Sequence, residues 1–297
     1  MNVHRTPLVW TLIGALAASA VFFLIRWVRE ARRISSERGA APPGPTPLLL
    51  AVGLVTNFFD TLGIGSIATT TAIFRLFRLV PDELIPGTII VGDLLAVMAQ
   101  AALFIGVVEV DPVQLTALIL ACVAGGWLGT GVVTRLSRRA MQLGLGTALL
   151  VAVLFMAVGM FGLNPAGGTA RALTPAAFAL ALAVNFVLGA LLPLGIGNYA
   201  PSLVVFGLLG LDLKAAFPIM MGSGAFAATV AGVRFLSTRR FQQQAALGLV
   251  LGGIPGVIVA VWLVKSLPLG ALRVVVLAVV LYAAVTLLRA GMSRRAV

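Results

Sequence analysis

Apolar runs of about twenty residues recur along the chain and constrain its fold more than any other feature. They lie at residues 8–25, 84–107, 113–134, 140–162, 214–236, 243–265 and 269–290. A helix of about 20 apolar residues crosses the bilayer core, whereas a membrane β-barrel would show alternating segments of about ten residues. Only 10% of the residues are charged, against about 25% in soluble domains. The sequence therefore predicts an all-α, polytopic transmembrane helical bundle and excludes a soluble enzyme.

The scarcity of metal-binding and nucleophilic residues excludes further classes of protein. The chain has one cysteine, Cys122, and one histidine, His4, too few for a disulfide framework, a haem site or a Ser-His hydrolase. It has no Walker sequence for ATP hydrolysis. We therefore expect no enzymatic activity, no metal and no cofactor. We attribute the net charge of +12 to cytoplasmic loops, not to nucleic-acid binding.

The N-terminal segment is predicted to be a retained membrane helix. Its apolar stretch at 8–25 is followed by the larger basic cluster, whereas a signal peptide carries its basic residues in front. We expect residues 1–38 to form this helix and a basic cytoplasmic segment, with the N-terminus outside. Residues 39–47, GAAPPGPTP, are predicted to be a Pro/Gly linker.

The rest of the chain reads as an internal duplication. The tetrapeptide LGIG occurs at 62–65 and again at 194–197, an offset of 132. The same offset places Phe74 on Phe206, Pro86 on Pro218 and Gly92 on Gly224. At offset 131, Ala121, Gly125 and Gly129 fall on Gly252, Gly256 and Ala260, which are small residues at helix-packing spacing. An Asn-Phe pair recurs with a different spacing, at Asn57-Phe58 and Asn185-Phe186.

The two repeats are predicted to be inverted relative to one another. Residues 48–79 would form a helix about 48 Å long, too long for one span, so we expect each LGIG segment to be a broken or re-entrant helix. Each half then has three full spans, and sixteen of the 21 basic residues lie on one side, as the positive-inside rule predicts. A parallel arrangement, with four spans in each half, would place Arg135–Arg139 and Arg234–Arg240 on opposite sides of the membrane.

This topology divides the chain into five parts. They are the N-terminal helix at 1–38, the linker at 39–47, the first repeat at 48–162, an extracytoplasmic loop at 163–174 and the second repeat at 175–297. The loop at 108–112 is also predicted to be extracytoplasmic, and the basic loops at 135–139 and 237–242 cytoplasmic.

The doubled segments FFDTLGIGSIATTTAIF and LLPLGIGNYAPSLVVF resemble the sulfite exporter TauE/SafE family of membrane permeases. The resemblance covers residues 48–290. The family motif is closer to LGIGGG, and this chain has Ser66 and Asn198 where the family commonly has the glycine after LGIG. It implies a permease of the inner cell membrane that transports small organic or sulfur-containing anions. The partners expected are this anion and the lipid bilayer, with no nucleic acid and with homo-oligomerisation left open.

The residues around the two breaks are candidate anion-binding groups. A helix start leaves backbone N–H groups free and carries a partial positive charge, and Ser66 and Asn198 are favoured N-cap residues. Pro201 suits a first helical turn. The candidate binding residues are Gly63, Gly65, Ser66, Thr69, Thr70, Gly195, Gly197, Asn198, Tyr199, Ser202, Asn57 and Asn185. The alternative is that the glycines serve helix packing and the asparagines bridge helices.

Two carboxylates fall inside predicted membrane segments, where they often mark proton or ion pathways. Asp93 lies within the 84–107 run and shares a helix face with Gln100, and Asp60 lies three residues before Gly63. We predict that Asp93, and secondarily Asp60, couples transport to protons, while a structural role for each stays open. An alternative function is a cation/proton exchanger, or a channel, built around these two residues.

Overall fold

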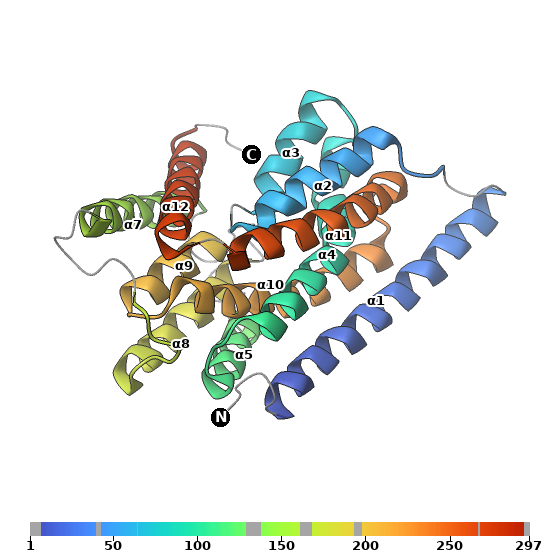
Figure 1. Ribbon diagram of the computed structural model, residues 1–297. Helices are drawn as coiled ribbons and strands as arrows, with labels where there is room; N and C mark the ends of the chain where they lie inside the picture. Colours follow the sequence, from blue (N-terminus) through green and yellow to red (C-terminus); the bar gives the residue numbers. More distant parts are fainter. Residues whose placement is uncertain are drawn as a thin grey trace.

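The computed structural model describes residues 7–39, 43–63, 65–128, 138–160, 168–192, 198–266 and 268–293, which are helical apart from short connections (Figure 1). Its α-helices are α1 (Pro7–Arg38), α2 (Pro47–Thr61), α3 (Ser66–Leu76), α4 (Ile85–Val107), α5 (Pro112–Leu128), α7 (Arg138–Met160), α8 (Pro175–Leu191), α9 (Tyr199–Leu208), α10 (Leu213–Thr238), α11 (Gln243–Ser266) and α12 (Leu269–Met292). A short 3₁₀ helix, η2 (Asp82–Leu84), precedes α4. The described extended pairings are two isolated bridges, Gly168–Asp212 and Ala170–Leu211.

Within the described parts of the chain, five helical segments are long and apolar enough to cross a membrane, which indicates a multi-pass membrane protein. They are Pro7–Glu37, Asp82–Val107, Leu213–Thr238, Gln243–Val264 and Val274–Met292. The predicted all-helical class is confirmed, and the apolar runs predicted for α4, α10, α11 and α12 agree with the observed helices within two residues. Shorter apolar helices, among them α2, α8 and α9, lie between the long ones.

The N-terminal helix α1 is longer than its apolar run and lies along one edge of the bundle (Figure 1). Its buried stripe, which includes Phe23 and Trp27, faces α4 and α10. Its polar end is tied to the turn after α10, because Arg239 donates to Glu30 at 2.5 Å and to Glu37 at 2.6 and 3.0 Å. The N-terminal helix is therefore held at the end of the bundle where α10 finishes.

Helices α2 and α3 form a hairpin around the first LGIG sequence. Phe74, near the end of α3, packs in one apolar cluster with Leu49 at the start of α2 and Ile85 at the start of α4. The hairpin therefore begins and ends at the same end of the bundle.

Helices α8 and α9 form a corresponding hairpin at the other end. Leu173, just before α8, exchanges hydrogen bonds with the Gln114 side chain. Leu211, just after α9, pairs with Ala170. Both ends of this second hairpin therefore lie beside the loop between α4 and α5.

Helices α4 and α10 run antiparallel. The backbone N–H of Gln242, after the end of α10, donates to Thr88 Oγ1 near the start of α4 at 2.8 Å. At the opposite end, Glu109 after α4 forms an ion pair with Arg171, and Asp212 before α10 bonds to Ala170. Each helix thus begins where the other finishes.

Glycines allow the closest helix contacts. A Cβ added at Gly125 in α5 would overlap the Phe186 carbonyl group in α8, and one at Gly256 in α11 would overlap the Leu54 carbonyl group in α2. Close backbone approach through small residues is how membrane helices gain packing energy.

Gly125→Ala is expected to destabilise the protein strongly, because its methyl group meets backbone atoms that cannot rotate away. Overpacking costs about 1–3 kcal/mol or more. Gly144→Ala in α7 is the matched control, since a Cβ there meets nothing within 4 Å and alanine favours a helix over glycine. Thermal unfolding in detergent measures both variants, and equal midpoints would contradict the packing role of Gly125.

Candidate functional site

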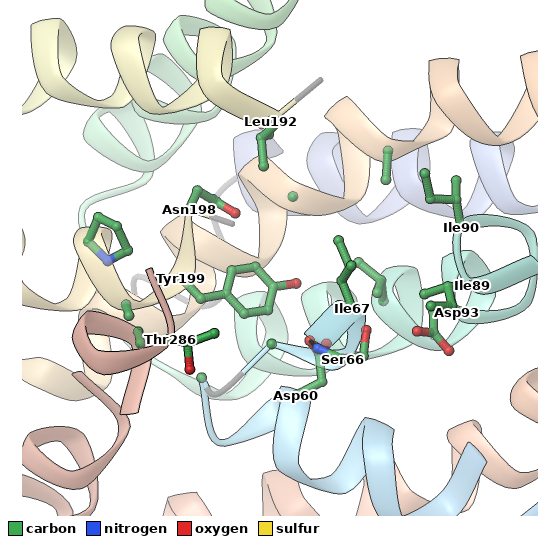
Figure 2. A pocket seen from close by; sticks show the side chains of 18 of the residues that line it. Asp60, Ser66, Ile67, Ile89, Ile90, Asp93, Leu192, Asn198, Tyr199 and Thr286 are labelled. Carbon is green, nitrogen blue, oxygen red and sulfur yellow. Dashed lines mark hydrogen bonds between the residues drawn. The ribbon is translucent and has the colours of Figure 1, made fainter. Parts of the chain in front are cut away.

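A cavity of about 270 Å³ lies where the first helical break meets α4, α9 and α12. Figure 2 shows its side chains converging from separate helices. Most of the described lining is apolar. The polar lining residues are Asp60, Ser66, Asp93, Asn198, Tyr199, Tyr282 and Thr286. Helices α3 and α9 both begin at this cavity, although Ser66 and Asn198 are 132 positions apart in the sequence.

Asp60 closes the start of α3. The Ser66 backbone N–H donates to Asp60 Oδ1 at 2.6 Å. Gly63 and Gly65, with φ of 98° and 86°, let the chain turn back between the two helices. These left-handed conformations favour glycine. The carboxylate therefore accepts from the first N–H group that the break leaves without a helical partner.

The predicted capping roles of the Ser66 and Asn198 side chains are wrong. Gly65, which has no side chain, is the N-cap of α3, and Ser66 is instead the first residue of the helix. The Ser66 backbone N–H is held by Asp60. Asn198 is the N-cap of α9 as predicted, but its side chain does not cap the helix. It donates instead to the Met220 carbonyl group of α10 at 3.2 Å.

Gln100 connects the first break with α9. Its Nε2 donates to Asp60 Oδ2 at 3.0 Å and to Tyr199 Oη at 2.9 Å, and its Oε1 accepts from Thr61 Oγ1 at 2.8 Å. Gln100 and Thr61 are fully buried. This amide therefore fixes the Asp60 carboxylate and positions Tyr199 in the cavity wall.

Asp93 is the second carboxylate of the cavity. Its Oδ1 accepts from Asn57 Nδ2 at 3.0 Å, whereas its Oδ2 has no hydrogen-bond partner among the described residues. The side chain of Ser66 is near enough to interact with both Asp93 and Asp60. Asp60 and Asp93 are 3% and 4% exposed, and they are the only charged residues in the described lining.

The other predicted binding residues lie outside the described lining. Asn185 bridges helices, since it donates to the Leu118 carbonyl group at 2.6 Å and to Ser223 Oγ at 3.1 Å. Thr69 bonds to the Ser66 carbonyl group at 2.9 Å. Thr70 and Ser202 are fully buried, and their hydroxyl groups have no partner within the described structure. Gly195 and Gly197 belong to 193–197, which lies outside the described residues.

Two polar lining residues were missed in the sequence. Tyr282 and Thr286 reach the cavity from α12. They are four residues apart, so they share one helix face. They are also the only polar residues between Arg273 and Arg289, and this polar pair in an apolar helix was the signal available.

The cavity brings together two kinds of polar group. Two helix starts offer backbone N–H groups, and two buried carboxylates can take up protons. No three His, Cys, Asp or Glu side chains come together among the described residues, as a metal site of that kind would need. No family model matches the chain, and no match was found among curated proteins or solved structures.

Proposed function

We propose that this protein is a secondary transporter that carries a small anion, such as sulfite or a sulfonate, across the inner cell membrane. The convergence of the starts of α3 and α9 on one cavity carries the proposal. Helix N-termini bind anions through free N–H groups and the helix dipole, without a buried lysine or arginine. The resemblance of the two LGIG segments to TauE/SafE permeases points to the same substrate class.

An inverted repeat is supported by the way the helices pair. Helix α2 of the first half packs on α11 of the second, and α8 packs on α5. The close contact of Gly125 with Phe186 matches that of Gly256 with Leu54, because the positions differ by 131 and 132. Helices α4 and α10 occupy equivalent places in the two halves and run antiparallel. Inverted-repeat transporters place broken helices and their substrate near the bilayer midplane.

Cysteine labelling is expected to place the two ends of the bundle on opposite sides of the membrane. In a Cys122→Ala background, Glu83→Cys and Thr238→Cys should react with an impermeant thiol reagent from the cytoplasm, and Thr169→Cys from outside. All three positions are exposed. The basic residues cluster at the end of the bundle that carries positions 83 and 238, which the positive-inside rule assigns to the cytoplasm. Labelling of positions 83 and 238 from opposite sides would contradict the inverted arrangement.

The proposed function is tested by ligand-induced stabilisation of the purified protein. A ligand at a hundred times its Kd stabilises the folded state by about 2.7 kcal/mol. Sulfite and methanesulfonate should raise the unfolding temperature, whereas choline at the same ionic strength should not. Uptake of methanesulfonate into proteoliposomes should then saturate with concentration. Absence of both effects with every anion of the panel would overturn the proposal.

A cation/proton exchanger is the second candidate, because the only charged side chains in the described lining are the carboxylates of Asp60 and Asp93. Such a site would attract a cation directly. Stabilisation by sodium, potassium or an organic cation, without stabilisation by any anion, would favour this candidate over the first.

A further inference from the structure

A transported anion meets an obstacle in this cavity. The Ser66 N–H, the first donor at the start of α3, is already held by Asp60 Oδ1 at 2.6 Å. The described lining has no basic side chain that would offset the Asp60 charge. Two like charges a few ångströms apart repel strongly where water is scarce. An anion therefore cannot share this helix start with an ionised Asp60.

We propose that Asp60 is a built-in substitute for the substrate anion, which replaces it at the start of α3 only when Asp60 has bound a proton. The inference rests on the proposed function and adds a rule of coupling: one proton travels with each monovalent anion.

The exchange conserves charge. A proton from solvent bonds to Oδ1 of the Asp60 carboxylate, which becomes a neutral carboxylic acid and gives up the Ser66 N–H. An oxygen of the substrate then accepts the hydrogen bond from the Ser66 N–H. The site loses one negative charge from Asp60 and gains one from a monovalent anion, so the loaded and empty sites carry equal charge. Transport of such an anion is therefore electroneutral.

Asp93 provides a second, independent sign that the cavity exchanges ions. Its side chain is 96% buried, being 4% exposed. Asp93 lines the cavity, and its buried Oδ2 has no hydrogen-bond partner among the described residues. An oxygen in this state is open to a proton that enters through the cavity. We infer that Asp93 passes protons to and from Asp60.

The remaining groups that face Asp60 do not supply a competing charge. Tyr199 of α9 and Tyr282 of α12 are the other titratable groups in the described lining, together with Asp93 of α4. Helix α11, which packs on α2, carries no acidic or basic residue from Gln243 to Val264. Proton uptake that accompanies anion binding is therefore assigned to the carboxylates.

The first experiment measures proton uptake when purified wild-type protein binds methanesulfonate, which stays singly charged across the pH range. At pH values where Asp60 is ionised in the free protein, calorimetry in buffers of different ionisation enthalpy should give one proton per bound anion. In that range the affinity should fall by about tenfold for each unit by which the pH is raised, as one linked proton requires. In proteoliposomes, a proton gradient should drive uptake, and a membrane potential should not.

The second experiment removes the titrating group. Asp60→Asn should bind methanesulfonate with an affinity that no longer depends on pH, and should release no proton on dissociation. Asp212→Asn is the matched control, since Asp212 also accepts a backbone N–H at a helix start, from Lys214 at 2.7 Å, and lies outside the described lining. It should keep the wild-type pH dependence.

The outcomes separate this inference from the proposed function. Methanesulfonate binding without proton uptake, or with pH dependence intact in Asp60→Asn, overturns the inference and leaves the transporter standing. Absence of anion binding to the wild-type protein at every pH overturns the proposed function itself. If Asp60→Asn does not fold, the proton count of the wild-type protein decides alone.

Discussion

Gly65→Val should weaken methanesulfonate binding by about a hundredfold or more, which corresponds to about 2.7 kcal/mol. Gly65 is the N-cap of α3 and lines the cavity. A Cβ at this position meets no atom within 4 Å, so a valine side chain enters space that an anion at Ser66 would need. Isothermal titration measures the affinity, and thermal unfolding measures stability on the same sample.

Backbone strain is the competing explanation, because Gly65 has a φ of +86° that disfavours any side chain. Gly39→Val is the matched control. Gly39 has a φ of +67°, a Cβ there also meets nothing within 4 Å, and it follows α1, outside the described lining of the cavity. Both variants should lose stability, and only Gly65→Val should lose binding. A folded Gly65→Val protein with wild-type affinity would refute the anion site at α3.

The broad arrangement of helices could be predicted from sequence because bilayer thickness fixes the length of an apolar run. The position of the first break was also predictable, since Gly63 and Gly65 interrupt a segment too long for one span. The chemistry within the break was not. The hydrogen bonds of Gln100 to Asp60 and Tyr199 join residues 40 and 99 positions apart. These contacts depend on how the helices pack, and no local sequence pattern predicts which buried donor meets which acceptor.

The Asn-Phe pairs show how local similarity can mislead. Offset 132 places Asn185 on Gly53, not on Asn57. In the structure, Asn185 bonds to Leu118, and a Cβ at Gly53 would contact the backbone of Leu249, which is the offset-131 counterpart of Leu118. Asn57 lies one helical turn further on and reaches Asp93. The two asparagines thus occupy different places in their halves, and only Asn57 adjoins a cavity carboxylate.

Asp93→Asn is expected to reduce proton-driven methanesulfonate uptake at least about tenfold while binding stays measurable. The asparagine keeps a carbonyl oxygen that can accept from Asn57 Nδ2, as Asp93 Oδ1 does at 3.0 Å, so the contact between α2 and α4 survives. The variant has no carboxylate to pass a proton to Asp60. Equilibrium binding, which depends on Asp60, should keep its pH dependence.

The measurement compares two modes of transport in the same proteoliposomes. Uptake driven by a proton gradient should fall, whereas exchange of labelled for unlabelled methanesulfonate at equal pH should continue, because exchange needs no net proton transfer. Asp111→Asn is the control, since Asp111 accepts the Gln114 backbone N–H at 2.8 Å in the loop between α4 and α5, and it should leave both modes unchanged. Proton-driven uptake at the wild-type rate in Asp93→Asn would leave Asp93 only its structural contact with Asn57, and Asp60 would then exchange its proton by another route.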